Sequence, residues 1–526
     1  MDIAKALETS FCLREELIRD FHRPRYHFLP ADGLWNDVNG TLYWKGRYHV
    51  FFLARKKNEN LEAIEEESRP IFWEWLPVWA HVSSLDLIHW RYHPTFLPSG
   101  KPDMPQGLFS GDAIEGADRA TLIYHVPMQG TCIAVSNDDN LDEWTPLREN
   151  PVIHWEAGNK KNSAKFDGLS KTEIDSYDGV GNLPECAIFD PCGWKEGETY
   201  YALIGNKNYR KGYEGDSTSL FRSKDLMDWE YVGPFYKSDR QWTAEIEDCA
   251  CPDFFPFGDK HMLLMHTHRP YGKSQYYIGT YRNHRFYPEI NGQLSRRGSM
   301  HMAPETLIDD RGRRIYWGWI ADARDYDEFS SYPKKGWSSV MTLPWHLYPS
   351  EDNTLQIKPV EELESLRYDQ IKLDALTLAQ GEEKKIDSIS SNCMEIKMTV
   401  ISEPGGTFGL KLLCSPDEKE ETVVTYDGKV EAFVVDFERA SLNKNLRYPD
   451  NSWKQVIPYT SSEKELDLDI FVDRSVIEIF VNSDICIVQR VYPTLKKSTQ
   501  LRFFSTDAPV QFRNITKWEM DATNPW

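Results

Sequence analysis

The chain has 526 residues, too many for one ordinary hydrophobic core, so we expect two or more domains. Its formal net charge of -21 would repel nucleic-acid phosphates and anionic lipids, which argues against both partners and favours a neutral small molecule. Aromatic residues make up 13% of the chain, a content typical of strand-rich proteins and of surfaces that stack on sugars.

The first residues, MDIAKALETSFCLREELIRDF, are charged and lack the apolar core of a signal peptide. No apolar run approaches the ~18 residues that a membrane-spanning helix needs. The nine cysteines are scattered and odd in number, which is typical of reduced thiols rather than of a disulfide framework. These features predict a cytoplasmic protein. We further expect a monomer or homo-oligomer that needs no cofactor.

Short apolar and aromatic runs follow one another from about residue 42 to 347, among them YHVFF, TLIYHV, TYYALIG, HMLLMH and RIYWGWI. Turns rich in Gly, Asp, Asn and Pro separate them at intervals typical of antiparallel β structure. One pattern recurs: SLDLIHW, SNDDNLDEW and SKDLMDW each place Asp two residues after Ser and close on Trp. A repeat of roughly 50 to 90 residues predicts propeller blades with insertions, in which the pattern forms turns rather than a site.

The pattern changes near YPSEDNTLQIKPVEELESLRYDQ. A polar stretch leads into a short amphipathic segment over 359–367, which we expect to be helical, and alternating strands such as CMEIKMTV, LDLDIFVD and SVIEIFVN follow. A tail of about 150 residues with this alternation predicts a β-sandwich. We therefore expect a propeller over 1–350, a linker with a short helix over 351–370 and a sandwich over 371–526.

Carboxylates inside apolar or aromatic runs are candidates for a site, because a charge there is costly unless it has a function. A propeller brings such side chains together in a central funnel, from the first strand of each blade. Hydrolysis of a glycosidic bond needs two carboxyl groups, one of them a nucleophile or base and the other a proton donor. Three stretches qualify: LWNDVNG with Asp37, AIFDPCGW with Asp190, and AEIEDCACPDFF with Glu245, Glu247 and Asp248.

In this order, the three stretches resemble the WMNDPNG, RDP and ECPDFF motifs of glycoside hydrolase family 32, the invertase, inulinase, levanase and fructosyltransferase group. Other stretches resemble further landmarks of the family: RPRYHFLP, VWAHVSSLDLIHW, GLFSGDAI, MAPET, YWGWI, GWSSVMTLPWHL and FVDRSVIEIFVN. The ordered set covers nearly the whole chain. The resemblance implies an all-β fold, in which a five-bladed β-propeller carries the active site and a β-sandwich follows.

By position, the resemblance implies that Asp37 is the nucleophile and that Asp190 stabilises the transition state. A carboxylate can attack a fructosyl oxocarbenium-like centre and form a covalent intermediate, while a second one binds hydroxyls of the same ring. The alternative interpretation, that both aspartates only shape turns, is weakened by the ordered set of motifs. The residues expected to bind substrate are Trp35, Asn36, Asn39, Trp79, Phe109, Ser110 and Trp337.

The third motif departs from the family, because Ala250 stands where the family carries its acid/base glutamate. We expect Glu247, brought round by a bulge, to supply the proton, with Asp248 and Glu245 as alternatives. Leu53 stands where the family has a fructose-contacting Gln, and Phe189 where it has the Arg of RDP. These changes indicate a divergent subfamily whose substrate need not be plain sucrose. Two insertions, about 56–75 and 155–184, are expected to overhang the funnel.

A metal site is a further possibility in the third motif. Cys249, Cys251, His266 and His268 flank the turn PFGDK and would make a zinc-like ligand set if they faced one another across a hairpin. CxC is not the usual zinc spacing, however, and Cys251 has a counterpart in the family's metal-free motif. We therefore expect these residues to pack and not to bind a metal.

Three functions remain open at this point. The first is a retaining β-fructofuranosidase acting on sucrose or fructo-oligosaccharides. The second is a transfructosylase with the same residues, in which a sugar replaces water as the acceptor. The third is a non-catalytic fructan-binding protein that has lost its acid, an interpretation that Ala250 allows and the retained Asp37 and Asp190 oppose.

Overall fold

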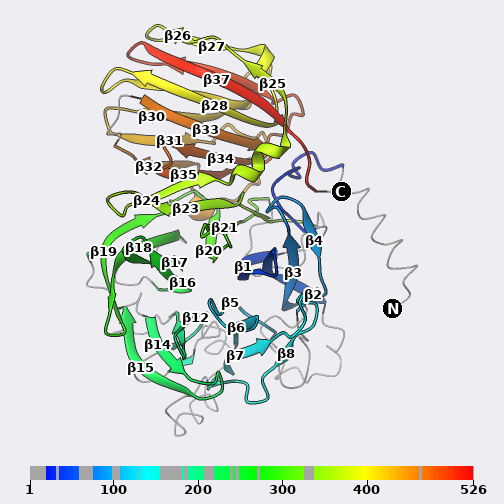
Figure 1. Cartoon of the computed structure of the whole chain (residues 1–526). Helices are drawn as coiled ribbons and strands as arrows, with labels where there is room; N and C mark the ends of the chain where they lie inside the picture. The colour runs from blue at the N-terminus through cyan, green and yellow to red at the C-terminus, as the bar shows by residue number, and fades with distance from the viewer. Residues whose placement is uncertain are drawn as a thin grey trace.

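The computed structural model describes residues 19–30, 35–57, 75–96, 107–127, 129–154, 181–182, 187–205, 218–236, 241–242, 248–268, 273–324, 337–460 and 465–524. Strands dominate these residues, joined by turns and short 3₁₀ helices. Figure 1 shows two units, a ring of small sheets and a stack of long strands on one side of it. In the described part of the chain, no helix is both long enough and apolar enough to cross a membrane.

The ring consists of five antiparallel sheets. Blade I contains β1 (Trp35–Trp44), β2 (Arg47–Lys57), β3 (Trp75–Ser84) and β4 (Trp90–Tyr92). Blade II contains β5 (Gly111–Ala113), β6 (Thr121–Val126), β7 (Gly130–Val135), β8 (Thr145–Pro146) and β9 (Ile153–His154). Blade III contains β12 (Pro191–Glu196), β13 (Thr199–Ile204), β14 (Thr218–Ser223) and β15 (Trp229–Tyr236), and the pair β10 (Gly181–Asn182) and β11 (Ala187–Ile188) precedes it.

Blade IV contains β16 (Ala250–Phe257), β17 (Lys260–Thr267), β18 (Lys273–Arg282) and β19 (Arg285–Gln293). Blade V contains β20 (His301–Ile308), β21 (Arg314–Ile320), β22 (Val340–Met341), β23 (Trp345–Pro349) and β24 (Leu355–Pro359). The first strands β1, β5, β12, β16 and β20 contact one another in this order, and β20 contacts β1 again. The chain therefore folds as a five-bladed β-propeller, with the first strands around the axis (Figure 1).

The continuous apolar runs follow from packing between blades. β6, β7 and β21 are buried along their whole length, because neighbouring blades cover both of their faces. A strand buried on both faces has no need for the alternation of a half-exposed strand. Separate apolar clusters fill the spaces between blades I and II, II and III, and III and IV.

The recurring Ser-x-Asp pattern forms the same turn in three blades. In the third copy, Asp225 accepts the backbone N–H groups of Met227 and Asp228, and the Trp229 indole donates to the Leu226 carbonyl oxygen at 3.0 Å. Leu226 has a φ of 71°, which the turn imposes on a bulky side chain. The serine–aspartate pairs are Ser84–Asp86, Ser136–Asp138 and Ser223–Asp225.

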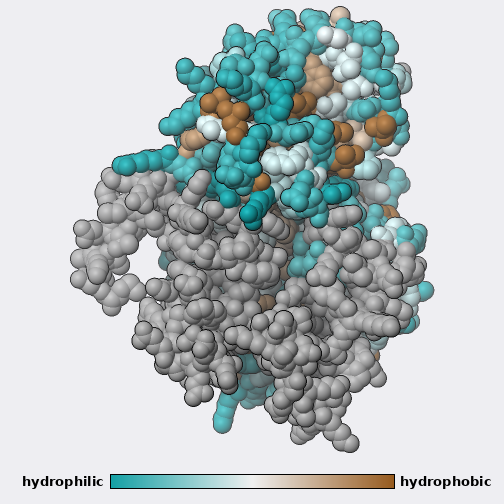
Figure 2. All heavy atoms as spheres, turned by 180° about the vertical axis from the view of Figure 1, so that it is seen from behind, coloured by the Kyte–Doolittle hydropathy of each residue, from teal (hydrophilic) through white to brown (hydrophobic). Residues whose placement is uncertain are grey.

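The second unit is a β-sandwich of two antiparallel sheets. The first sheet contains β25 (Arg367–Lys372), β26 (Leu376–Leu378), β28 (Cys393–Ser402), β33 (Glu465–Asp473), β34 (Val476–Val481), β35 (Ile485–Arg490) and β37 (Val510–Met520). The second contains β27 (Glu383–Lys385), β29 (Thr407–Cys414), β30 (Thr422–Asp427), β31 (Ala432–Asp436), β32 (Lys454–Pro458) and β36 (Gln500–Ser505). The 3₁₀ helices η5 (Asp387–Ile389) and η6 (Pro449–Asn451) lie in its connections. Figure 2 shows a mostly hydrophilic surface on this unit.

The junction between the units lies slightly later than the sequence suggested. β24 pairs with β23 and so belongs to blade V, although it falls within the segment 351–370 that we expected to be a linker. The expected helix is the 3₁₀ helix η4 (Glu361–Leu366), and β25 of the sandwich follows it directly. The connection is therefore one short 3₁₀ helix.

The two units are joined by a fully buried ionic cluster centred on His27. Its Nδ1 lies 3.0 Å from Asp473 and its Nε2 3.2 Å from Glu478, both on the sandwich. The Trp345 indole of blade V donates to Glu478 at 2.8 Å. Burial lowers the pKa of His27, but hydrogen bonds to Asp473 and Glu478 outweigh this effect and raise it to about 9.

We expect the thermal stability of the protein to fall as pH rises from about 6.5 to 9, because the charged form of His27 stabilises only the folded state. This contribution is complete below the unfolded pKa and is lost as pH passes the folded pKa. Melting temperatures across that range should therefore decrease in the wild type, and the decrease should be smaller in His27→Gln. An equal decrease in both proteins would contradict the role of this histidine.

Candidate active site

Asp37 sits at a β-bulge at the start of β1. Asn36 pairs with Leu53 on β2 and Val38 with Phe52, so Asp37 is the extra residue between them. A bulge re-aims the side chain of its extra residue, which here is the carboxylate. The Ser110 hydroxyl of blade II donates to Asp37 Oδ2 at 2.6 Å. The carboxylate is therefore held by two neighbouring blades.

Asn39 locks this part of β1 against the beginning of blade II. Its amide group donates to the Asp37 carbonyl oxygen at 2.9 Å, and its Oδ1 accepts the Gly111 N–H at 3.2 Å. Only glycine fits at position 111, because a Cβ would lie 2.2 Å from the Ile123 carbonyl oxygen. The Asn-Asp-x-Asn-Gly and Ser-Gly stretches thus build one rigid support for the Asp37 carboxylate.

Asp190 lies between β11 and β12 and is 3% exposed. Its Oδ2 accepts the backbone N–H of Cys251 at 3.1 Å and faces the Cys251 thiol at 3.5 Å. The same thiol lies 3.9 Å from Asp37 Oδ2. One cysteine on blade IV therefore contacts both candidate carboxylates, which come from blades I and III.

The backbone around Cys251 is irregular. A second bulge covers Cys251 and Pro252, between Ala250 and Asp253, and Cys251 has a φ of 44°, uncommon for a residue with a side chain. Burial, together with the charges of Asp190 and Asp37, raises the pKa of the thiol well above its usual range. The thiol stays protonated and can donate to the carboxylates.

The third motif is described only in part. Glu245 and Glu247 lie outside the described residues, so the preference for Glu247 stays a prediction. The bulge of this motif follows Ala250 rather than preceding it. Asp248 is described, and both of its oxygens accept hydrogen bonds from His268, at 2.7 Å from the backbone N–H and 2.7 Å from ring Nδ1.

The expected substrate-binding residues fall into different groups. Ser110 contacts Asp37, and Asn36 Oδ1 is buried with no hydrogen-bond partner in the described part of the chain. The side chain of Trp35 lies outside the described residues, and Phe109 is partly buried. The Phe109 carbonyl oxygen accepts the Trp79 indole N–H at 3.0 Å.

Two tryptophans require a correction. Trp79 is 0% exposed and packs in the core between blades I and II, and Trp337 is 1% exposed and donates its N–H to Asp20. Neither ring presents a face on which a sugar could stack. Their burial follows from contacts between blades and between domains, which local sequence does not reveal.

The two residues that replace polar residues of the family, Leu53 and Phe189, are both buried in the structure. Leu53 is buried opposite Asn36, where a Gln would offer an amide group. Phe189 is buried with its ring edge-on to His125, at 5.7 Å between ring centroids. The two insertions expected to overhang the funnel lie mostly outside the described residues.

One group of described residues has nitrogen, sulfur or carboxylate atoms close enough together to suggest a metal. It contains His49, His81 and His93, whose ligand atoms lie within 4.8 Å of one another. The rings of His81 and His93 stack, with centroids 4.2 Å apart and an angle of 24°, so their in-plane lone pairs do not converge on one point. Burial lowers the pKa of all three histidines, that of His49 to about 3, which disfavours their charged forms.

Within the part of the chain that the structure describes, the cysteines and histidines of the third motif do not form such a group. Cys249 packs between blades III and IV, whereas Cys251 contacts the carboxylates and His268 contacts Asp248.

Sequence reasoning missed a pair of buried carboxyl groups, Asp112 on β5 and Glu305 on β20. Burial raises the pKa of Asp112 to about 8 and that of Glu305 well above its usual range, which favours the protonated form of each carboxyl group. Both lie in quoted motifs, GLFSGDAI and MAPET. An acid inside an apolar run, the same signal that singled out Asp37, could have found both.

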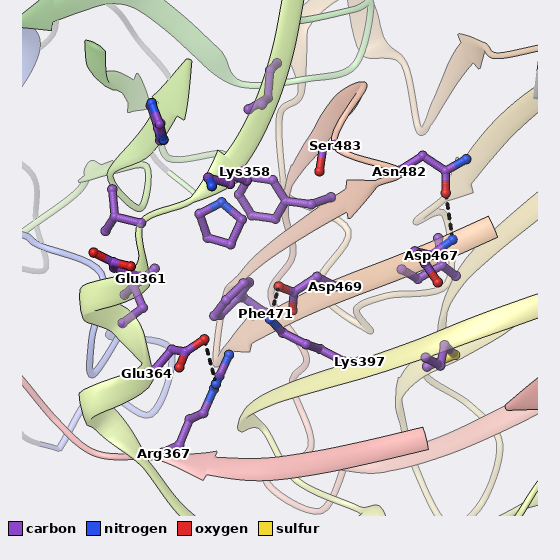
Figure 3. Close-up of a pocket in the computed structure, with 18 of the residues that line it drawn as sticks. Lys358, Glu361, Glu364, Arg367, Lys397, Asp467, Asp469, Phe471, Asn482 and Ser483 are labelled. Atoms are coloured by element: carbon purple, nitrogen blue, oxygen red, sulfur yellow. Dashed lines mark hydrogen bonds and ion pairs between the residues drawn. The ribbon is translucent and has the colours of Figure 1, made fainter. Parts of the chain in front are cut away.

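A cavity of about 750 Å³ lies away from the carboxylates. It is lined by blade V, η4 and the sandwich, without residues of β1, β12 or β16. Figure 3 shows that much of its charge is paired, Arg367 with Glu364 and Lys397 with Asp469, each at 3.0 Å. This cavity lies between the two domains and does not include the candidate site.

Comparison with known proteins agrees with this arrangement. The model of the glycosyl hydrolases family 32 N-terminal domain matches residues 27–166 and 184–359, and that of the family 32 C terminal matches 362–519. A sucrose-6-phosphate hydrolase from Zymomonas mobilis is 27% identical over 523 residues, covering 95% of this chain and 93% of that protein. A β-fructofuranosidase, insoluble isoenzyme 1, from Daucus carota is 26% identical, covering 96% and 90%.

The fold comparison gives the same result. The structure of a fructan 1-exohydrolase IIa variant from Cichorium intybus in complex with 1-kestose superposes with a TM-score of 0.75 at 20% identity, covering 96% of this chain and 98% of that one. Both domains, the order of the motifs and the paired aspartates in the propeller therefore point the same way: the chain belongs to glycosyl hydrolase family 32 and is a glycoside hydrolase.

Proposed function

We propose that this protein is a retaining β-fructofuranosidase that cleaves fructosyl bonds in sucrose or fructo-oligosaccharides. Asp37 attacks the anomeric carbon of the fructosyl unit, and Asp190 binds hydroxyls of the same ring and favours the positive charge of the transition state. The observation that carries the proposal is the Cys251 thiol, which lies 3.9 Å from Asp37 and 3.5 Å from Asp190 and so supports a common site for the two carboxylates.

Several observations support a neutral fructoside as substrate. The chain has a net charge of -21, and the described partners of the carboxylates are hydroxyl, thiol and amide groups rather than the cationic side chains that bind phosphate. Asn36 Oδ1 is a buried acceptor without a described partner, which a sugar hydroxyl would satisfy. Of the two named relatives, the β-fructofuranosidase agrees with a neutral fructoside, whereas the sucrose-6-phosphate hydrolase is named for a phosphorylated substrate.

Transfer of the fructosyl group to a second sugar is the alternative within the same mechanism, because hydrolysis and transfer differ only in the acceptor. Fructan binding without catalysis is the alternative that Ala250 suggests. Cytoplasmic action is part of the proposal and is supported by the seven described cysteines, which are buried and form no disulfide with one another. Reduced thiols are typical of that compartment.

An assay of fructose release and oligosaccharide products on sucrose, inulin and levan tests the proposal. We expect fructose as the main product, appearing first as its β anomer in proton NMR of the early reaction, because two displacements at one carbon retain configuration. Growing oligosaccharides would assign transfer instead. The α anomer appearing first would contradict the retaining mechanism, and binding without turnover would favour the non-catalytic alternative.

A further inference from the structure

Ala250 leaves the third motif without a proton donor at the position where the family carries glutamate. Cleavage of a sugar–sugar bond still needs a group that protonates the leaving oxygen, because a sugar alkoxide is a poor leaving group. A replacement that works from the same place must lie on the face of the sheet to which Ala250 belongs.

The strand register places His268 beside that position. The Cα of Ala250 pairs with that of His266 on β17, and His268 follows two residues later, just beyond the end of the strand. Side chains two residues apart share a face of a sheet. Diagonal neighbours on that face lie roughly 7–8 Å apart, within reach of a ring side chain. The register thus puts His268 diagonally across from position 250, within reach of the space that a glutamate there would occupy.

Asp248 fixes the orientation of this imidazole. Its Oδ1 accepts the His268 backbone N–H and its Oδ2 lies at 2.7 Å from ring Nδ1. A carboxylate acceptor at Nδ1 keeps a proton there, so Nε2 is the atom that exchanges a proton with a substrate. The exposed fractions agree with these roles, because the side chain of Asp248 is 1% exposed and that of His268 is 22%.

We propose that His268, oriented by Asp248, is the proton-transfer residue of this enzyme, in place of the Glu247 expected from the sequence. The assignment rests on the proposed function. The third motif reaches the two aspartates, because Cys251, the residue after Ala250, contacts both Asp37 and Asp190.

The two steps balance with this residue. When Asp37 attacks C2 of the fructosyl unit, the C2–O bond to the leaving sugar breaks and the His268 imidazolium gives its Nε2 proton to the departing oxygen. In the second step the neutral imidazole takes a proton from water while the water oxygen attacks C2. The bond from C2 to Asp37 breaks, which releases fructose and restores the carboxylate and the imidazolium.

Kinetics of His268→Gln on two substrates test the assignment. On sucrose, kcat/KM should fall about 10²–10⁴-fold, the usual contribution of a general acid–base. On an aryl β-fructofuranoside, whose leaving group departs unaided, the first step should be far less impaired, and retained activity there also shows that the variant folds. Added azide should restore part of the lost turnover, because a small anion needs no general base.

Two further variants sharpen the test. Asp248→Asn should lower activity on sucrose and move the limb of the pH–rate profile that reports the imidazolium to lower pH, since the carboxylate no longer stabilises that charge. His261→Gln is the matched control: it changes a histidine at the opposite end of the same strand, paired with Pro256, and should leave activity unchanged.

Wild-type kcat/KM on sucrose in His268→Gln would overturn the inference. The same holds if Glu247→Gln shows the substrate dependence and azide rescue while His268→Gln shows neither. These outcomes differ from failure of the proposed function itself, which would appear as undiminished hydrolysis of both substrates in Asp37→Ala.

Discussion

Asp37→Ala should reduce kcat on sucrose by about 10⁴-fold or more, because removing a nucleophile removes the covalent route altogether. The fold should remain intact. Asp37 is the extra residue of a bulge, it is only partly buried, and its described side-chain contacts are the Ser110 hydroxyl and the Cys251 thiol. Loss of such a side chain should change the melting temperature little.

The measurement is turnover of sucrose and of an aryl fructoside by the same purified variant. Both should be lost, since the nucleophile acts on either substrate, in contrast to a proton donor. Ser110→Ala is the matched control, because it removes the 2.6 Å hydrogen bond to Asp37 while leaving the carboxylate in place. We expect this variant to lose activity about 10-fold, because one hydrogen bond contributes about 1.5 kcal/mol. Measurable wild-type-like turnover by Asp37→Ala would end the nucleophile assignment.

The fold could be predicted largely from the sequence because its signals are local and repeated. Short apolar runs, turns and the Ser-x-Asp copies mark each blade, and the turn chemistry is visible in the letters themselves. The end of blade V was harder to place. β24 follows a polar turn that looks like a linker, and only its pairing with β23 shows that it belongs to the propeller.

The residues of the candidate site could be predicted where a charged side chain stands within an apolar run of the sequence. Asp37 and Asp190 stand out as acids among apolar residues, and Asp37 proves to be a bulge residue. Trp79 and Trp337 were misplaced, because a tryptophan beside a motif looks alike in sequence whether it faces a funnel or a domain interface. The dual contact of Cys251 was equally hidden, since it depends on three blades meeting at the axis.

Asp190 should be essential for a different reason, and two substitutions separate its roles. Asp190→Ala removes both the charge and the acceptor of the buried Cys251 N–H, which costs roughly 1–3 kcal/mol of stability in addition to activity. Asp190→Asn keeps an acceptor oxygen of the same shape and removes only the charge. The melting temperature of the Asn variant should therefore lie closer to that of the wild type.

The activity of the two variants should differ in kcat and KM. A carboxylate about 4–5 Å from a developing positive charge contributes roughly 3–4 kcal/mol at an effective dielectric constant near 20, which corresponds to a loss of about 10²–10³-fold in kcat. Asp190→Asn should show this loss with KM nearly unchanged, because its amide still bonds sugar hydroxyls. Asp190→Ala should lose kcat and raise KM as well. Near-wild-type kcat in Asp190→Asn would mean that the charge does not act on the transition state, and that Asp190 serves only to bind the ring.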